Sequence, residues 1–328
     1  MKRVSALGLM LVALLALPIA RAAAQANDYP NRPVTFVVPF APGGVTDLFA
    51  RTLAQQLEKH FGKPFVVENK GGGGGLPAVS GVAHGASDGY TLLMASSTAM
   101  AINVSIRKSL PYDPRTDLQV VSLIARVPFV LVVNPSLPVH SVDDLVKLIR
   151  SQPGKMTFAT PGPGTFHHLN AELFMSRFGL KMIHVPYKGS APALNDLIAG
   201  HIQMMFCDVP PAIGLIRAGK LRALGVTTAQ RVEAAPELTP LAEVGMPGYD
   251  TASWHSVAVQ GQVPKPIVDK LHGALTQIMN DPAVRKTLIE HGTIPQTSPS
   301  PEELKRFVAS EIDVWGKVVE KAGIAHSR

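Results

Sequence analysis

The chain has 328 residues, 46% of them hydrophobic, with 31 Lys and Arg against 24 Asp and Glu. This length allows two domains of ordinary size, and the hydrophobic content excludes a mainly disordered chain. Cys207 is the single cysteine, which excludes an internal disulfide, and no Lys/Arg cluster is interleaved with aromatic residues, which argues against nucleic-acid binding.

The first 26 residues have the pattern of a secretory signal peptide. Lys2 and Arg3 precede an apolar run over residues 6–20, and small residues then give the signal-peptidase pattern Ala-x-Ala twice between residues 22 and 26. A membrane anchor is the alternative, but fifteen apolar residues fall short of the roughly 20 that a span needs. We therefore expect export and cleavage near residues 24–26.

The rest of the chain alternates short apolar runs with helical patterns. This alternation is typical of an α/β fold whose sheet is largely parallel, with helices in the crossover connections. The expected strands are 34–38, 64–68, 90–95, 129–133, 156–159, 182–186, 202–206, 221–226 and 254–260.

Helices are expected between these strands. One carries Phe49, Leu53 and Leu57 on one face, a second opens with Ser141-x-x-Asp144, and a third follows Gly189. The last helix is signalled by a capping box, Ser300 with Glu303, and by Pro301 at its first position. Its buried stripe is expected to be Leu304, Val308, Ile312, Trp315 and Val319.

Three features predict two lobes rather than one long sheet. Residues 118–133 form a nearly continuous strand pattern, interrupted by Pro128, that could cross from one lobe to the other. Residues 245–253 contain Gly and Pro and suit a return crossing. The pattern after residue 263 is purely helical, which suits helices that pack back onto the first lobe.

The strongest local signal for a binding site is residues 34–51. The strand ends at Pro39, Gly43 and Gly44 let the backbone approach a ligand, and a helix begins near Thr46. The free N–H groups of its first turn could bind a carboxylate or phosphate without a lysine. The alternative is a plain strand–helix turn in which Thr46 caps its own helix.

A second loop of the same kind spans residues 158–170. A strand again runs into glycines, Gly162 and Gly164, and a helix follows Thr165. If the two loops face each other from separate lobes, two helix N-termini converge on one cleft. A third strand end, residues 95–98, would supply hydroxyl groups to the same space.

Other motifs favour structural interpretations. Gly71–Gly75 lacks the Lys-Ser/Thr ending of a P-loop and is better explained as a flexible turn. No His-Glu-x-x-His motif is present. The adjacent His167 and His168 point about 100° apart on a helix, and His184 and His255 have no carboxylate near them in sequence. We therefore expect no catalytic residues, no metal site and no cofactor.

The sequence resembles the substrate-binding proteins of tripartite tricarboxylate transporters, the Bug family, over essentially the whole mature chain. The specificity lies in the order of the matching stretches rather than in any single motif. They are PFAPGGVTDLFAR, FVVENKGGGGG, SDGYTLLM, LPYDPRTDL, GPGTFHHL, HVPYKGSAPALNDLIAGHIQMMF, IRAGKLRALGVTT and VWGKVVEKAGI.

The resemblance implies a periplasmic two-lobe binding protein of type II topology, a "Venus flytrap". The first lobe would comprise residues 27–124 and 248–328 and the second residues 125–247, with hinges near 124 and 248. Such a monomer would pass a small carboxylate to integral membrane transporter subunits. The implied ligand-binding residues are Phe40, Ala41, Pro42, Gly43, Gly44, Thr46 and Asp47 on one wall, Ser97 and Thr98 beside it, and Gly164, Thr165, His168, Tyr187 and Asp208 from the second lobe.

Two departures from the family pattern bear on the ligand. Met100 stands where the family usually has a histidine, and Cys207 stands where many members have an acidic residue, with Asp208 one place later. Both changes argue against an amino acid, whose ammonium group needs a carboxylate, and favour a ligand with an apolar or aromatic body. The candidate ligands are di- and tricarboxylates and aromatic carboxylates, with acidic amino acids less favoured. The alternatives are a sensor subunit with the same fold, or a hydrolase that uses His168 with Thr165 or Cys207.

Overall fold

The computed structural model describes residues 28–326, so the predicted signal peptide lies outside the described residues. The strands are β1 (Val34–Val38), β2 (Phe65–Asn69), β3 (Thr91–Ser96), β4 (Leu118–Val133), β5 (Thr157–Thr160), β6 (Ile183–Pro186), β7 (Met204–Asp208), β8 (Arg222–Val226), β9 (Ala252–Gln260) and β10 (Ile294–Pro295). The helices are α2 (Val45–Phe61), η1 (Gly73–Gly75), α3 (Leu76–Ala83), η2 (Thr98–Ile102), α4 (Asn103–Ile106), α5 (Val142–Ser151), α6 (Phe166–Phe178), α7 (Ser190–Ala199), α8 (Val209–Arg217), α9 (Lys265–Asn280), α10 (Pro282–Glu290) and α11 (Pro301–Lys321).

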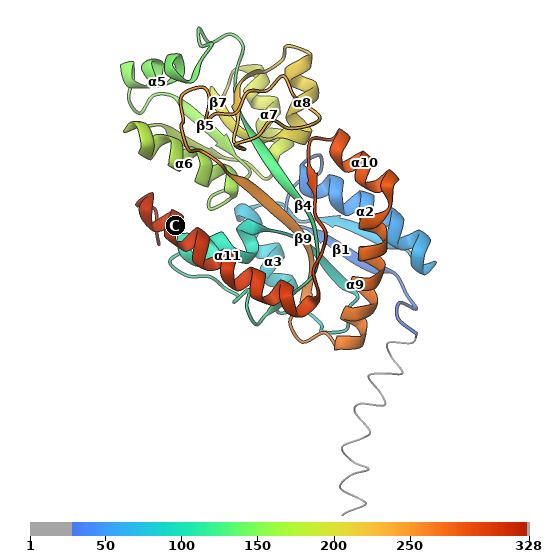
Figure 1. The fold of residues 1–328 in the computed structure, drawn as a ribbon. Coiled ribbons are helices and arrows are strands. Elements are labelled where there is room, and N and C mark those ends of the chain that lie inside the picture. Colours follow the sequence, from blue (N-terminus) through green and yellow to red (C-terminus); the bar gives the residue numbers. More distant parts are fainter. Residues whose placement is uncertain (1–27, 327–328) are drawn as a thin grey trace, which may run out of the picture.

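The strands form one mixed sheet that is divided between two lobes. The order is β2-β1-β3-β9-β4-β7-β5-β6, with β8 and β10 also paired to β4. Around β1 and around β5 the strands are parallel, whereas β4 runs antiparallel to β9, β7 and β8. We call the part built around β1, β2, β3 and β9 the first lobe, and the part built around β5, β6 and β7 the second (Figure 1).

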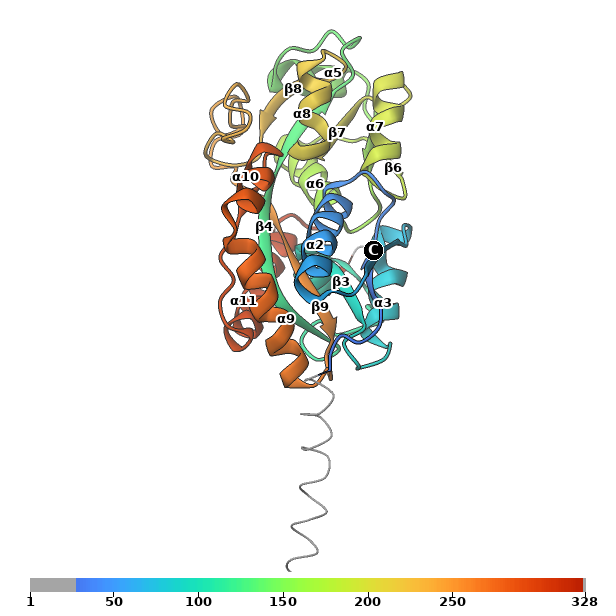
Figure 2. The same cartoon turned by 90° about the vertical axis from the view of Figure 1, so that its right-hand side faces the viewer.

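Strand β4 connects the two lobes, as its sequence pattern predicted. Its first part pairs with β9 as far as Pro128, opposite Ala252, and its last residues pair with β7 from Phe129 onwards. Pro128 therefore lies where β4 changes partners, a position at which a strand tolerates the missing N–H of proline. The long strand runs along the length of the molecule in Figure 2.

Each lobe has helices on both faces of its sheet. In the first lobe, α2, α9 and α10 cover one face and α3 and α11 cover the other. In the second lobe, α5 and α6 cover one face and α7 and α8 the other. Because both faces are covered, the strands are apolar along most of their length, which explains their continuous apolar runs in the sequence. Within residues 28–326, no helix combines the length and apolarity that a membrane crossing requires.

The last helix returns to the first lobe, as expected. The capping box of Ser300 and Glu303 is confirmed, because each side chain hydrogen-bonds the backbone of the other residue. The predicted stripe of Leu304, Val308, Ile312, Trp315 and Val319 is buried. The segment before it was predicted to be purely helical but contains the two-residue strand β10 on the edge of β4, which is too short to leave a periodic signal.

Candidate ligand-binding site

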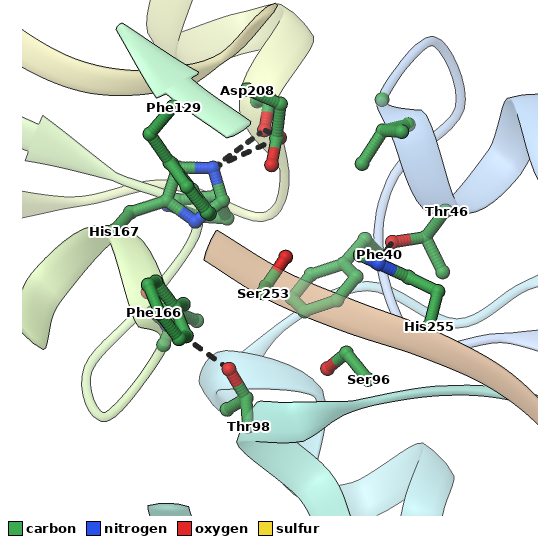
Figure 3. Close-up of a pocket in the computed structure, with 15 residues that line it drawn as sticks. Phe40, Thr46, Ser96, Thr98, Phe129, Phe166, His167, Asp208, Ser253 and His255 are labelled. Carbon is green, nitrogen blue, oxygen red and sulfur yellow. Dashed lines mark hydrogen bonds and ion pairs between the residues drawn. The ribbon is translucent and has the colours of Figure 1, made fainter. Parts of the chain in front are cut away.

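A cavity of about 30 Å³ lies between the lobes, and the first residues of several helices line it. Val45 begins α2 in the first lobe, Phe166 begins α6 and Ser190 begins α7 in the second lobe, and Asp208 is the N-cap of α8. Figure 3 shows Asp208 and His167 on one side of this space, with Thr46 and His255 on the other. The N-terminal ends of four helices thus lie around the cavity.

The N-terminus of α2 is arranged to bind an anion. Its N-cap is Gly44, which has extended backbone angles, and no described side chain caps the first turn. The hydroxyl of Thr46 lies 3.2 Å from Nε2 of His255 instead, so Thr46 does not cap its own helix. The N–H groups at the start of α2 are therefore available to a negatively charged group in the cavity.

Asp47 stabilises the conformation of the loop that precedes α2. Its side chain is 5% exposed and accepts hydrogen bonds from the Gly43 amide (3.1 Å), from the Asn69 side-chain amide (2.9 Å) and from Arg51 (3.0 Å). Burial alone would raise the pKa of Asp47, but these hydrogen bonds and the charge of Arg51 lower it overall. Asp47 is thus ionised and positions the loop without lining the cavity.

Two of the first-turn donors of α6 are already used within the protein. The amide of Phe166 donates to Oγ1 of Thr98 in the first lobe (3.0 Å), and the amide of His168 donates to Oγ1 of Thr165 (3.4 Å). The Thr165 hydroxyl in turn donates to the carbonyl of Gly162 (2.8 Å). The second predicted loop therefore supplies fewer free donors than its sequence suggested.

Asp208 is the one carboxylate in the cavity wall. It is 2% exposed, and its Oδ2 lies 3.0 Å from Nε2 of His167 and accepts a hydrogen bond from Ser190 (3.2 Å). Its Oδ1 has no hydrogen-bond partner among residues 28–326. Burial alone would raise the pKa of Asp208, but the interactions with His167, followed by those with His255 and Ser190, lower it overall.

Six of the fourteen sequence-predicted residues line the cavity, and all six come from the strand ends and loops named above. They are Phe40, Gly44, Thr46, Thr98, Thr165 and Asp208. The other eight lie around it without lining it. They are Ala41, Pro42, Gly43, Asp47, Ser97, Gly164, His168 and Tyr187.

Two of these eight have side chains engaged inside the second lobe. The Tyr187 hydroxyl donates to Asp196 (2.6 Å). The His168 ring lies 3.1 Å from Glu172 and stacks on His184. Neither interaction leaves the side chain directed at the cavity.

Nine lining residues were not among the predicted ligand-binding residues, although five of them lie in the segments 34–51, 95–98 and 158–170 that the sequence indicated. Ser253 and His255 lie on β9, which is placed beside the site by its antiparallel pairing with β3 and β4. His167 and Ser190 were visible at helix starts but were not assigned to the site. The full set is Val45, Ser96, Phe129, Pro161, Phe166, His167, Ser190, Ser253 and His255.

The cavity contains few charges. None of the fifteen lining residues, all within the described part of the chain, is Lys or Arg. Burial lowers the pKa of His255 to about 4, against a smaller opposing effect of Asp208, so this ring is neutral at neutral pH. Backbone N–H groups therefore supply most of the positive potential.

The side chains of Ser190, His167 and Asp208 are not arranged as a catalytic relay. Both Ser190 Oγ (3.4 Å) and Asp208 Oδ2 (3.0 Å) approach the same nitrogen of His167, Nε2. A serine–histidine–carboxylate relay needs the serine and the carboxylate on different ring nitrogens. Residues 28–326 also contain no group of three His, Cys, Asp or Glu side chains placed to share a metal ion.

The two lobes touch on either side of the cavity. The Ala41 amide donates to the carbonyl of Lys188 (2.9 Å), and Arg107 donates to the carbonyl of Pro163 (2.8 Å). With about 30 Å³ inside, the cavity has room for only one or two water molecules. The structure is therefore a closed form, which a larger molecule could enter only after the lobes separate.

Comparisons with known proteins cover both lobes. The sequence model of one protein family, described as the tripartite tricarboxylate transporter family receptor, matches residues 49–324. The chain is 38% identical to protein BugT of Bordetella pertussis over 301 residues, 91% of this chain and 92% of BugT.

Solved structures give the same result. R. palustris Rpa4515, solved with adipate, has a TM-score of 0.86 at 40% identity, covering 91% of this chain and 99% of that one. MatC from Rhodopseudomonas palustris, with bound malate, has a TM-score of 0.84 at 30% identity, covering 89% and 100%. The periplasmic binding protein BugD has a TM-score of 0.86 at 32% identity, covering 90% and 99%. The predicted two-lobe fold class is confirmed.

Proposed function

The chain belongs to the tripartite tricarboxylate transporter receptor family, and on that premise we propose that its lobes close around one small carboxylate in the periplasm and present it to membrane subunits of a transporter. The uncapped first turn of α2, which faces the interlobe cavity, carries this proposal. Relatives solved with adipate and with malate support the same class of ligand.

In this proposal the ligand's carboxylate accepts hydrogen bonds from N–H groups at the start of α2, beside Gly44 and Thr46. A hydrogen bond between a charged group and a backbone N–H contributes about 1.5–3 kcal/mol. Three such bonds, less the cost of ordering the ligand, are consistent with a dissociation constant near about 1 μM. The remaining predicted residues, including Ala41, Gly43 and Gly164, would shape the loops that close around the ligand.

Within the described residues, the lobes would move as two rigid bodies, residues 28–124 with 248–326 and residues 125–247. The hinge would comprise the middle of β4 and the segment before β9. In that segment the hydroxyls of Tyr249 (2.7 Å) and Thr251 (2.9 Å) both donate to Oδ1 of Asn170, which ties it to α6. A ligand that contacts both lobes selects the closed form, because only there are all its contacts made.

We infer that the bound carboxylate is released unchanged. The approach of both Ser190 and Asp208 to one nitrogen of His167 supports binding rather than nucleophilic catalysis. Cys207 is fully buried in the core of the second lobe, and burial raises the pKa of its thiol well above its usual range. A thiol in that position is poorly suited to act as a nucleophile.

A thermal-shift screen of the mature protein against a library of carboxylates tests the proposal. A ligand at 100 times its dissociation constant adds about 2.7 kcal/mol to the free energy of unfolding. Gly44→Val is the matched variant, because Gly44 has extended angles that valine accepts, and the new side chain would enter the cavity. Stabilisation of the wild type alone is expected. No stabilising carboxylate, or equal stabilisation of both proteins, would refute the proposal.

A further inference from the structure

The cavity is polarised from one lobe to the other. The α2 side presents N–H groups that no described side chain caps. The opposite side presents Asp208, whose Oδ2 is held by His167 and Ser190 and whose Oδ1 has no partner within residues 28–326. A buried carboxylate oxygen without a partner is unfavourable, and a hydrogen-bond donor on a ligand would satisfy it.

Two of the helix starts in the second lobe, those of α8 and α6, offer little to a second negative charge. Helix α8 begins Val209-Pro210-Pro211, and the two prolines lack the N–H groups with which a helix start binds anions. At the start of α6, the amide of Phe166 is already bonded to Thr98. A second carboxylate of the ligand would therefore lie beside the Asp208 carboxylate without a Lys or Arg side chain among the lining residues to balance it.

The apolar part of the wall suits a ligand with a hydrocarbon body and a cationic end. Phe40 of the first lobe and Phe129 and Phe166 of the second all line the space (Figure 3). Aromatic rings bury methylene groups well and attract cations through their faces. Asp208 is the one carboxylate among the lining residues with which such an end would pair.

We propose that the natural ligand is a monocarboxylate whose other end carries a protonated amine, with the carboxylate at the start of α2 and the ammonium donating to Oδ1 of Asp208. This inference rests on the proposed function and narrows its ligand class. In the sequence, Cys207 at the position where many family members have an acidic residue argued against a ligand with an amine. In the structure, strand alternation in β7 places Cys207 in the core with Met205 and leaves the carboxylate of Asp208 at the cavity.

Calorimetry with matched ligand pairs tests the inference. Succinate and 3-aminopropanoate, glutarate and 4-aminobutanoate, and adipate and 5-aminopentanoate each share one hydrocarbon chain and differ only in whether the second end is a carboxylate or an ammonium. Near neutral pH the mature wild-type protein should bind the amine member of the best-fitting pair at least about tenfold more tightly. Asp208→Asn, which keeps the shape of the side chain, should abolish or reverse that preference.

Asp196→Asn is the control, because Asp196 is a carboxylate of the same lobe whose partner is Tyr187 rather than the cavity. It should keep the wild-type preference. Tighter wild-type binding of the dicarboxylates would overturn the inference and leave the proposed function standing, as would binding of other carboxylates but none of the three amines. No binding of any carboxylate would refute both. The wild-type comparison decides the matter even if Asp208→Asn fails to fold.

Discussion

Gly189, at the start of α7 in the second lobe, packs directly on Ala41 in the first glycine-rich loop. A Cβ atom on Gly189 would lie 2.9 Å from Cβ of Ala41, closer than carbon atoms pack. The same loops are joined by the hydrogen bond from the Ala41 amide to the Lys188 carbonyl. The two lobes can therefore approach this closely only because residue 189 has no side chain.

Gly189→Ala should weaken ligand binding without lowering stability. The backbone of Gly189 is extended, a conformation that alanine adopts freely, so the cost falls on the closed form alone. Overpacking of this kind costs about 1–3 kcal/mol, which corresponds to a roughly 5- to 150-fold loss of affinity for a carboxylate found in the screen. Calorimetry and small-angle scattering would measure the affinity and the compactness.

Gly214→Ala is the matched control, because Gly214 lies in α8 of the same lobe with open space where the methyl group would stand. It should bind like the wild type. If Gly189→Ala also kept wild-type affinity, the contact between Gly189 and Ala41 would have no part in closure.

His255 should make the protein sensitive to mild acid. Its folded-state pKa of about 4 lies below the ordinary value of 6.5, mainly because the ring is buried. As pH falls from 6.5 towards 4, the unfolded chain gains a proton that the folded chain does not, so stability present above this window is lost within it. The loss is about 3 kcal/mol at most.

Urea denaturation at neutral pH and near pH 4 would measure this effect. His255→Gln, which keeps a polar group beside Thr46, should remove most of the difference between the two conditions. His140→Gln, at an exposed histidine, should leave it unchanged. An equal acid sensitivity in all three proteins would show that other groups cause it.

The sequence predicted the local features of the fold more completely than the site. Residues 34–38 and the capping box at Ser300 are encoded within a few neighbouring residues, and the structure confirms both. His255 reaches the cavity because β9 pairs with β3, so that Ser96 lies opposite it. Such a pairing joins segments more than 150 residues apart, and a single sequence carries no local signal for it.

Tyr187 illustrates a second limit. Its position at a strand end near the cavity follows from the order of the strands, but its hydroxyl bonds Asp196 instead. Strand order fixes where a backbone runs, whereas the side chain's direction depends on which partner lies within reach. For the same reason Thr46 could not be assigned to His255 in advance.

Asp47→Ala should destabilise the first lobe. It would leave the Gly43 amide and the Asn69 side chain without their buried acceptor, at a cost of about 2–3 kcal/mol. Arg51→Ala removes only the half-exposed partner and should cost less than about 1 kcal/mol. Urea denaturation of both variants would measure the difference. Equal costs would mean that the ion pair, rather than the loop's hydrogen bonds, is what Asp47 contributes.

Thr165 was predicted from the sequence to contact the ligand, yet the structure gives its hydroxyl two partners inside the second lobe. It accepts from the His168 amide and donates to the Gly162 carbonyl, so it caps α6 and closes the loop before it. Thr165→Ala should therefore lower the free energy of unfolding by about 1 kcal/mol, the usual cost of losing an N-cap, and Thr165→Ser should restore it. If the alanine variant kept wild-type stability in urea but lost ligand affinity, the hydroxyl would belong to the binding surface, and the capping role would be secondary.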